Sequence, residues 1–212
     1  NGSVMVRYGD TMVLVTAVAA SEAREGLDYF PLQVEYREKT SAAGKFPGGY
    51  IKREGRPTEK EILSARLCDR PIRPMFPESF KNETQVIAMV MSYDGENDPD
   101  VLAACGASAA LAISDIPFDG PLAEIRIGRI AGELVVNPTH EQLKLSDIEL
   151  VVAGTSDSIM MVEGESKEVS EQDLLDALKF AQGEIRKIVE LQNQLRTEAG
   201  KTKWAVAEIT VD

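Results

Sequence analysis

The basic residues of this chain are concentrated in one stretch, from Lys45 to Arg73. It holds eight of the twenty-three lysines and arginines but only four acidic residues. The stretch therefore carries +4, whereas the other residues sum to -16, which together give the net charge of -12. A basic segment in an acidic protein predicts a local anion-binding site rather than a general coat for nucleic acid.

The residue types in the first part of this stretch suit a phosphate chain that carries bases. Gly48 and Gly49 allow a flexible approach, and Tyr50 offers a flat face on which a base can stack. Positive charge comes from Lys52, Arg53 and Arg56. The alternative is a solvated loop whose charges only keep the protein soluble, and spacing alone leaves both interpretations open.

The second part of the stretch has the pattern of a capped helix. Thr58 and Glu61 have capping-box spacing, which predicts that a helix begins there. It cannot run far past Arg70, because the proline that follows disfavours the α conformation in the residue before it. Arg66 and Arg70 would share one face, and Arg73 lies just beyond the end. Arginine favours bidentate contact with phosphate, although nearby acidic residues could pair with some of these side chains.

Other patterns that could do chemistry are weaker. The run from Phe46 to Gly49 could bring backbone N–H groups to a phosphate, but a tight turn is favoured because the ending of a P-loop is absent. Asp147 and Glu149 would share one face of a strand, where a divalent cation could bind, although such a pair is more often two acidic side chains that simply face water. His140 has no partner at ligand spacing. The sequence therefore assigns no catalytic residue and no metal ligand.

Composition narrows the class of protein. Hydrophobic residues make up 43% of the chain, which is enough for a sizeable core. The acidic balance argues against a membrane-surface role, and no apolar run approaches the roughly 20 residues that span a bilayer. Cys68 and Cys105 lie in apolar helical patterns, so we expect buried thiols rather than a disulfide. Because the chain begins at Asn1 without an initiator methionine, we also expect that one or two initial strands are missing.

The rest of the chain must supply the elements that position the basic stretch. Alternating residues predict a hairpin from Met5 to Val18 and a strand from Leu32 to Glu38 with one face in water. The loop that follows, Lys39 to Pro57, is long for a compact domain, and such loops are usually functional or mobile. In the capped helix, the buried stripe would be formed by Ile62, Leu63 and Leu67.

Further strands and helices complete the pattern. The continuous apolar run from Thr84 to Ser92 predicts a strand buried on both faces. Asp98-Pro99 begins an alanine-rich helix that should pack closely on the sheet, and Ser170 caps an amphipathic helix that reaches about Glu198. Two more hairpins are expected at Glu124–Ile130 with Glu133–Val136 and at Asp147–Ala153 with Ser158–Glu163. This order predicts an α+β fold with a mixed sheet, as one domain over 1–200 with a linker at 201–212.

The basic stretch and its flanks resemble a known family. Similarity to the polynucleotide phosphorylase family is carried by the run FPGGYIKREGRPTEKEILSARLCDRPIRPMFP, by DYFPLQVEYREKTSAAGKFPGG before it and by NDPDVLAACGASAALAISDIPFDGP after it. It continues through LVVAGT and MVEGE and so covers essentially the whole chain. The chain looks like the first of two ribonuclease PH-like core domains, which implies a ribonuclease PH-like fold. Single-domain ribonuclease PH has a different arginine-rich signature here and is the weaker match.

The resemblance implies a function that spacing alone does not. Members degrade RNA from its 3′ end by phosphorolysis, release nucleoside diphosphates and can run in reverse. They need inorganic phosphate and a divalent metal, usually Mg²⁺, and three chains form a ring whose channel takes single-stranded RNA. Their phosphate-binding serines and metal-binding aspartates lie chiefly in the second core domain, which this chain lacks. We therefore expect a cytoplasmic or organellar protein that positions RNA, builds a homotrimer, joins other RNA-degradation components and is inactive as this fragment.

The match also implies the site residues. In the family, the first core domain supplies a loop with two aromatic and two basic residues at the channel constriction, and arginines along the RNA path. The matching RNA-binding positions here are Tyr50, Ile51, Lys52, Arg53, Arg56, Arg66, Arg70 and Arg73. Ile51 stands where a second aromatic is frequent, and Lys52 stands where arginine is frequent. We therefore expect a weaker grip on RNA at these two positions.

Two other functions stay open. A non-catalytic ring subunit of an exosome-like complex would keep the fold and the RNA path without the chemistry. A stand-alone phosphorolytic exoribonuclease is disfavoured, because the sequence shows no convincing acidic cluster together with a phosphate-binding Ser/Thr pair.

Overall fold

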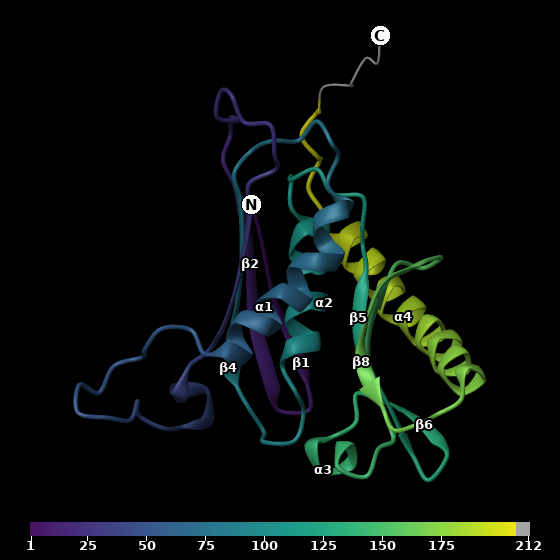
Figure 1. Cartoon of the computed structure of the whole chain (residues 1–212). Coiled ribbons are helices and arrows are strands. Elements are labelled where there is room, and N and C mark those ends of the chain that lie inside the picture. The colour runs from purple at the N-terminus through teal and green to yellow at the C-terminus, as the bar shows by residue number, and fades with distance from the viewer. Residues whose placement is uncertain (207–212) are drawn as a thin grey trace.

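The structure, a computed structural model, describes residues 1–206, in which two β-sheets pack with helices (Figure 1). The strands are β1 (Gly2–Tyr8), β2 (Thr11–Ala19), β3 (Leu32–Glu38), β4 (Thr84–Ser92), β5 (Ala123–Ile130), β6 (Glu133–Val136), β7 (Ile148–Gly154) and β8 (Ile159–Ser166). The α-helices are α1 (Glu59–Ile72), α2 (Asp100–Ile113), α3 (His140–Leu143) and α4 (Glu171–Ala199). The predicted hairpins, strands and long helices are all present, with ends that differ by a few residues.

The two sheets differ in strand direction. The first sheet has the order β1-β2-β4-β3, in which β3 and β4 are parallel and the other pairs are antiparallel. The second sheet has the order β6-β5-β7-β8 and is antiparallel throughout. The predicted α+β class with a mixed sheet is therefore confirmed. β3 and β4 can lie parallel because the long loop and α1 form the crossover between them.

The elements stack as the first sheet, then α1 with α2, then the second sheet, then α4 (Figure 1). Val15 and Val86 of the first sheet are fully buried in the core that this sheet shares with α1 and α2. The second sheet is covered on both faces, since Ile125 packs with α4 whereas Val151 packs with Val101 of α2. α1 is thus held between the sheets.

The prediction that β4 is buried on both faces is wrong. Val86, Ala88 and Val90 are buried, but the residues between them are only partly covered and Met91 is 48% exposed. These residues face away from the helices, on a side of the first sheet that no helix within residues 1–206 covers (Figure 1). Alternate residues of this apolar run therefore lie on the outer face of the sheet, where they are only partly covered, and are not part of a core.

α1 begins at the predicted capping box. The Thr58 hydroxyl accepts a hydrogen bond from the Glu61 backbone N–H at 3.2 Å, and the Glu61 carboxylate accepts one from the Thr58 N–H at 2.7 Å. The same carboxylate accepts the backbone N–H of Glu38, at the end of β3, at 2.9 Å. Glu61 therefore ties the start of the helix to the edge of the first sheet and sets how the helix is rotated.

This rotation makes the predicted buried stripe of α1 wrong. Ile62 and Leu63 are 50% and 56% exposed, and Leu67 is only partly buried. The side chains that face the core are instead Ser64, Cys68, Pro71 and Ile72. Glu61 has turned the more apolar face of the helix partly toward solvent, because its own face is the one held against β3.

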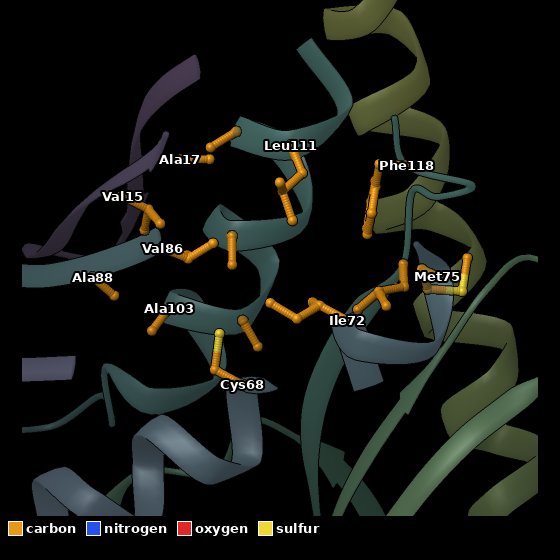
Figure 2. Packing of buried hydrophobic residues seen from close by; sticks show 14 of the residues in the cluster. Val15, Ala17, Cys68, Ile72, Met75, Val86, Ala88, Ala103, Leu111 and Phe118 are labelled. Atoms are coloured by element: carbon orange, nitrogen blue, oxygen red, sulfur yellow. The ribbon is translucent and has the colours of Figure 1, made fainter. Parts of the chain in front are cut away.

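α2 packs closely on the first sheet, as its alanine content predicts. A Cβ atom on Gly106 would lie 2.5 Å from Cγ2 of Val15, so only glycine fits there. Figure 2 shows Ala103 and Leu111 of α2 in the core together with Cys68 and Ile72 of α1. Both cysteines are buried and form no disulfide, as expected.

The segment after α4 is docked on the body of the protein. The Trp204 N–H donates to the carbonyl of Asp115 at 2.8 Å, and its ring packs against the first core. The Lys203 ammonium donates to the carbonyls of Leu111 and Ser114, at 2.7 Å each. Residues 201–206 of the predicted linker therefore lie against the end of α2, whereas 207–212 lie outside the described residues.

Candidate functional site

The loop between β3 and α1 projects away from the layered body (Figure 1). A short 3₁₀ turn at Thr40–Ala43 begins it, and the rest has no regular structure up to Thr58. Gly44 and Gly49 have φ values of 66° and 76°, which glycine adopts without strain. The loop is therefore built to leave the sheet edge and return to it.

Hydrogen bonds fix the base of this loop. The backbone N–H and the hydroxyl of Thr40 both donate to the Glu54 carboxylate, at 3.0 and 2.9 Å. The Arg37 guanidinium, on β3, donates to the carbonyl of Gly55 at 3.4 Å. The outgoing and returning limbs are thus joined, so that the part between them is presented as a unit.

The tip of the loop exposes the side chains that the sequence singled out. Tyr50 and Ile51 are 101% and 74% exposed. Lys52, Arg53 and Arg56 are exposed and have no hydrogen bond or ion pair with any residue of 1–206. The loop therefore presents an aromatic face beside cations whose donors are available to a ligand.

The arginines of α1 differ in their partners. Arg66 is exposed and makes no ion pair within the described chain. Arg70 forms an ion pair with Glu163 of β8, on the second sheet. Arg73 makes a two-pronged contact with Asp69, from Nε at 3.0 Å and Nη2 at 2.6 Å. The predicted face therefore holds one arginine without an internal partner and one that bridges to the second sheet.

Arg73 has a further structural contact, with the free edge of β3. Its guanidinium donates to the backbone carbonyls of Phe30 and Leu32, at 3.3 and 3.1 Å. The bond to Leu32 covers a carbonyl group that an edge strand otherwise leaves unpaired, whereas the Phe30 carbonyl also accepts the backbone N–H of Leu32 at 3.0 Å. Arg73 therefore lies beside the others in sequence but is committed to the fold, and its predicted contact with RNA stays a prediction.

A groove of about 790 Å³ runs along the edge of β3 beside α1. Sequence reasoning missed two basic residues that line it, Arg37 and Lys39, although Arg37 stands near the end of a predicted strand and Lys39 is the first residue of the loop. Arg66 lines the same groove, together with the exposed Ile62. The structure thus brings Arg66 next to residues of β3 rather than next to Arg73 alone.

The two carboxylates that suggested a metal are bound by arginines. Asp147 accepts two hydrogen bonds from Arg129, at 2.9 and 2.7 Å, which hold the pKa of Asp147 below its ordinary value. Glu149 pairs with the buried Arg126, which also pairs with Asp100. Within residues 1–206, no three metal-ligating side chains gather. Asp147 and Glu149 therefore form ion pairs with arginines of the neighbouring strand β5.

A buried carboxyl lies near this arginine cluster. Glu124 of β5 is 1% exposed, and neither carboxyl oxygen has a hydrogen-bond partner in the described chain. Burial raises the pKa of Glu124 well above its ordinary value, with a smaller contribution from the charge of Asp100. The side chain is closed off from solvent and from the loop, so we assign it no part in the site.

No helix among the described residues is long and apolar enough to cross a membrane.

Comparison with known proteins gives two consecutive family matches. Residues 1–117, which contain the first sheet, α1 and α2, match the family described as "3′ exoribonuclease family, domain 1". Residues 120–184, which contain the second sheet and part of α4, match "3′ exoribonuclease family, domain 2". The junction of the two matches falls between the two sheets. Whether 1–200 behaves as one domain stays a prediction.

Curated relatives share one name, polyribonucleotide nucleotidyltransferase. The protein of Persephonella marina is 57% identical over 97% of this chain, that of Geobacter sulfurreducens 55% over 100%, and that of Koribacter versatilis 54% over 100%. This chain spans 29%, 30% and 26% of the length of these three relatives.

Proposed function

Since this chain belongs to the 3′ exoribonuclease family, we propose that it is an RNA-binding, ring-forming core domain of a polyribonucleotide nucleotidyltransferase. The full-length enzyme would degrade RNA from its 3′ end by phosphorolysis to nucleoside diphosphates and would run in reverse to add nucleotides. High identity along the whole chain supports this assignment, and the shared name of the relatives favours the enzyme over a non-catalytic ring subunit.

The observation that carries the RNA-binding role is the loop tip. Tyr50 is fully exposed beside Lys52 and Arg53, whose donors have no partner within residues 1–206. An exposed aromatic face next to cations is the combination that holds a single strand without reading its sequence. Exposed Ile51 would add apolar contact where the family often has a second ring.

The proposed task of this chain is positioning rather than chemistry. Phosphoryl transfer depends chiefly on the placement of the reacting groups and on neutralisation of charge. Arg56 and Arg66 would guide the backbone between the loop and the body. Arg70 would do so only by leaving Glu163, and Arg73 contributes least because Asp69 and the β3 carbonyls already hold it.

Other parts of the proposal concern the full-length enzyme. Mg²⁺ and inorganic phosphate would be bound by a second core domain, because the acidic pair at Asp147 and Glu149 is already held by arginines. We propose a homotrimeric ring, a cytoplasmic or organellar location and contacts with other RNA-degradation components. Light scattering of the full-length protein tests the ring, and a mass other than that of three chains would contradict it.

Loop variants of the full-length enzyme test the RNA-binding role. Tyr50→Ala should weaken binding of a fluorescent oligoadenylate about fivefold or more, since one stacked base contributes about 1–3 kcal/mol. Lys52→Ala with Arg53→Ala should also lower the slope of log affinity against log salt, by about 0.7 for each phosphate that the variant no longer neutralises. Tyr29→Ala is the matched control, because Tyr29 is also exposed, at 60%, but lies outside the loop.

Single-turnover phosphorolysis of the same variants completes the test. The rate at low RNA concentration should fall with the affinity, whereas release of nucleoside diphosphate at saturating RNA should change less, because the loop holds substrate rather than reacting with it. If Tyr50→Ala and the double variant bind RNA as tightly as Tyr29→Ala, the proposed role of the loop is wrong. If the full-length protein releases no ADP from poly(A) and phosphate, it is a ring subunit without activity.

A further inference from the structure

We propose that the groove along the free edge of β3 is a second RNA subsite, which holds a nucleotide of the strand that the loop grips. This β3-edge groove is lined by Arg37, Lys39, Ile62, Ala65, Arg66 and Met89, among others. The proposal rests on the RNA-binding function proposed above, and it adds a position and a set of contacts to it.

The groove has the size and the surface that a nucleotide needs. Its volume of about 790 Å³ lies within the roughly 300–1,000 Å³ that small-molecule sites occupy. Its lining includes Ile62, which is 50% exposed on the solvent-facing side of α1, and Ile87 and Met89 of β4 from the outer face of the first sheet. The rotation imposed by Glu61 leaves Ile62 in this lining, where it can contact a base.

Among the described residues, the charges left unpaired in the groove sum to +1, from Lys39 and Arg66 against Glu35. Asp69 is neutralised by Arg73, and Glu61 lies 4.0 Å from the Arg37 guanidinium. Lys39 and Arg66, in contrast, form no ion pair with any residue of 1–206. Two exposed cations beside an apolar wall complement a nucleotide, which has a phosphate on one side and a base on the other.

The groove continues from the loop. Pro57, the last residue of the loop, lines the groove, and Lys39 stands at the other end of the same loop. The bond from Arg37 to Gly55 holds the returning limb against β3, the strand that borders the groove. A strand stacked on Tyr50 could therefore follow the returning limb directly into the groove.

A protein strand is the competing occupant, because β3 is an edge strand. Both ends of this edge are already covered. Arg73 binds the carbonyls of Phe30 and Leu32, and Glu61 binds the N–H of Glu38. An added strand would have to displace these bonds, whereas RNA needs only side chains. The structure therefore favours RNA.

Separate variants of the full-length protein test the charged and the apolar residues that line the groove. Lys39→Ala should lower the slope of log affinity for a fluorescent oligoadenylate against log salt by about 0.7, the value for one phosphate. Ile62→Ala should weaken binding about 3- to 10-fold and leave that slope unchanged, because it removes apolar contact only. The controls are Leu63→Ala, which changes an equally exposed leucine outside the groove, and Lys179→Ala on α4.

Photocrosslinking gives a second readout that does not depend on affinity. With p-benzoylphenylalanine at position 62, the labelled oligoadenylate should crosslink, and with the same group at position 63 it should crosslink much less.

If Tyr50→Ala weakens binding while Lys39→Ala and Ile62→Ala behave as their controls, the groove proposal is overturned and the loop role stands. If groove variants weaken binding and Tyr50→Ala does not, the subsite stands and the loop role fails. Crosslinks from position 62 to a protein in place of RNA would also overturn the groove proposal.

Discussion

At the scale of single residues, the predicted RNA-binding positions differ in what their side chains already contact. Tyr50, Lys52 and Arg66 have no internal partner among residues 1–206, so a ligand would meet them without breaking existing bonds. Arg73 is different, because it holds Asp69 and two carbonyls of the β3 edge. Arg66 and Arg73 are both arginines and lie only seven positions apart, yet they have different tasks.

This difference predicts opposite effects for two alanine variants. Arg73→Ala should lower the free energy of unfolding by about 1–2 kcal/mol, because it removes charged hydrogen bonds from a half-exposed side chain. Arg66→Ala should leave stability nearly unchanged and weaken RNA binding instead. Urea unfolding and oligoadenylate binding of both variants check this. Equal losses of stability would show that Arg66 also has a structural task.

At the scale of elements, local signals begin α1 and α4, whereas distant contacts orient α1 and α2. Thr58 and Ser170 form capping boxes that depend only on nearby residues. The rotation of α1, in contrast, follows from Glu61 reaching Glu38 of β3. The close approach of α2 to the first sheet likewise depends on Gly106 facing Val15.

The helical glycines give a matched pair of variants. Gly106→Ala should destabilise the protein by about 1–3 kcal/mol, because the new methyl group would lie 2.5 Å from Val15. Gly183→Ala, in α4, has no atom within 4 Å of the new methyl group and should stabilise by about 0.5–1 kcal/mol. Thermal unfolding of both variants tests this. A stabilised Gly106→Ala variant would mean that α2 and β2 can move apart at little cost.

At the scale of the whole molecule, the last residues of the described chain pack against the first half of the fold. The segment after α4 contacts the end of α2, which belongs to the first family match. Lys203 supplies the ammonium that binds the carbonyls of Leu111 and Ser114. A cation at this position adds hydrogen bonds to carbonyl groups at the end of α2 and complements the dipole of that helix.

Removal of this ammonium should therefore weaken the first part of the fold. Lys203→Met keeps the length of the side chain but removes both hydrogen bonds, and we expect the free energy of unfolding to fall by about 1–2 kcal/mol. That corresponds to a fall of about 2–8 °C in Tm for a chain of this size. Lys179→Met, on the exposed side of α4, is the control. Equal melting temperatures for the two variants would show that the docked segment adds no stability.

Local signals in the sequence were enough to predict where the strands, the long helices and the loop lie. Alternation gave the ends of β3 correctly, and capping residues gave the starts of α1 and α4. The same signals failed for the buried stripe of α1 and for the outer face of β4. Ile62 and Met91 are apolar and yet exposed, because burial depends on which neighbouring element covers a face.

By itself, therefore, the sequence determined the elements, the α+β class and the segment that carries the candidate RNA contacts, because these depend on residues close together in the chain. Only the tertiary structure decided which arginines are available and where the β3-edge groove lies. Arg70 meets Glu163 across 93 positions and Glu61 meets Glu38 across 23, and no local pattern specifies such partners. A charged side chain binds whatever the fold brings within reach, so its task is set by packing.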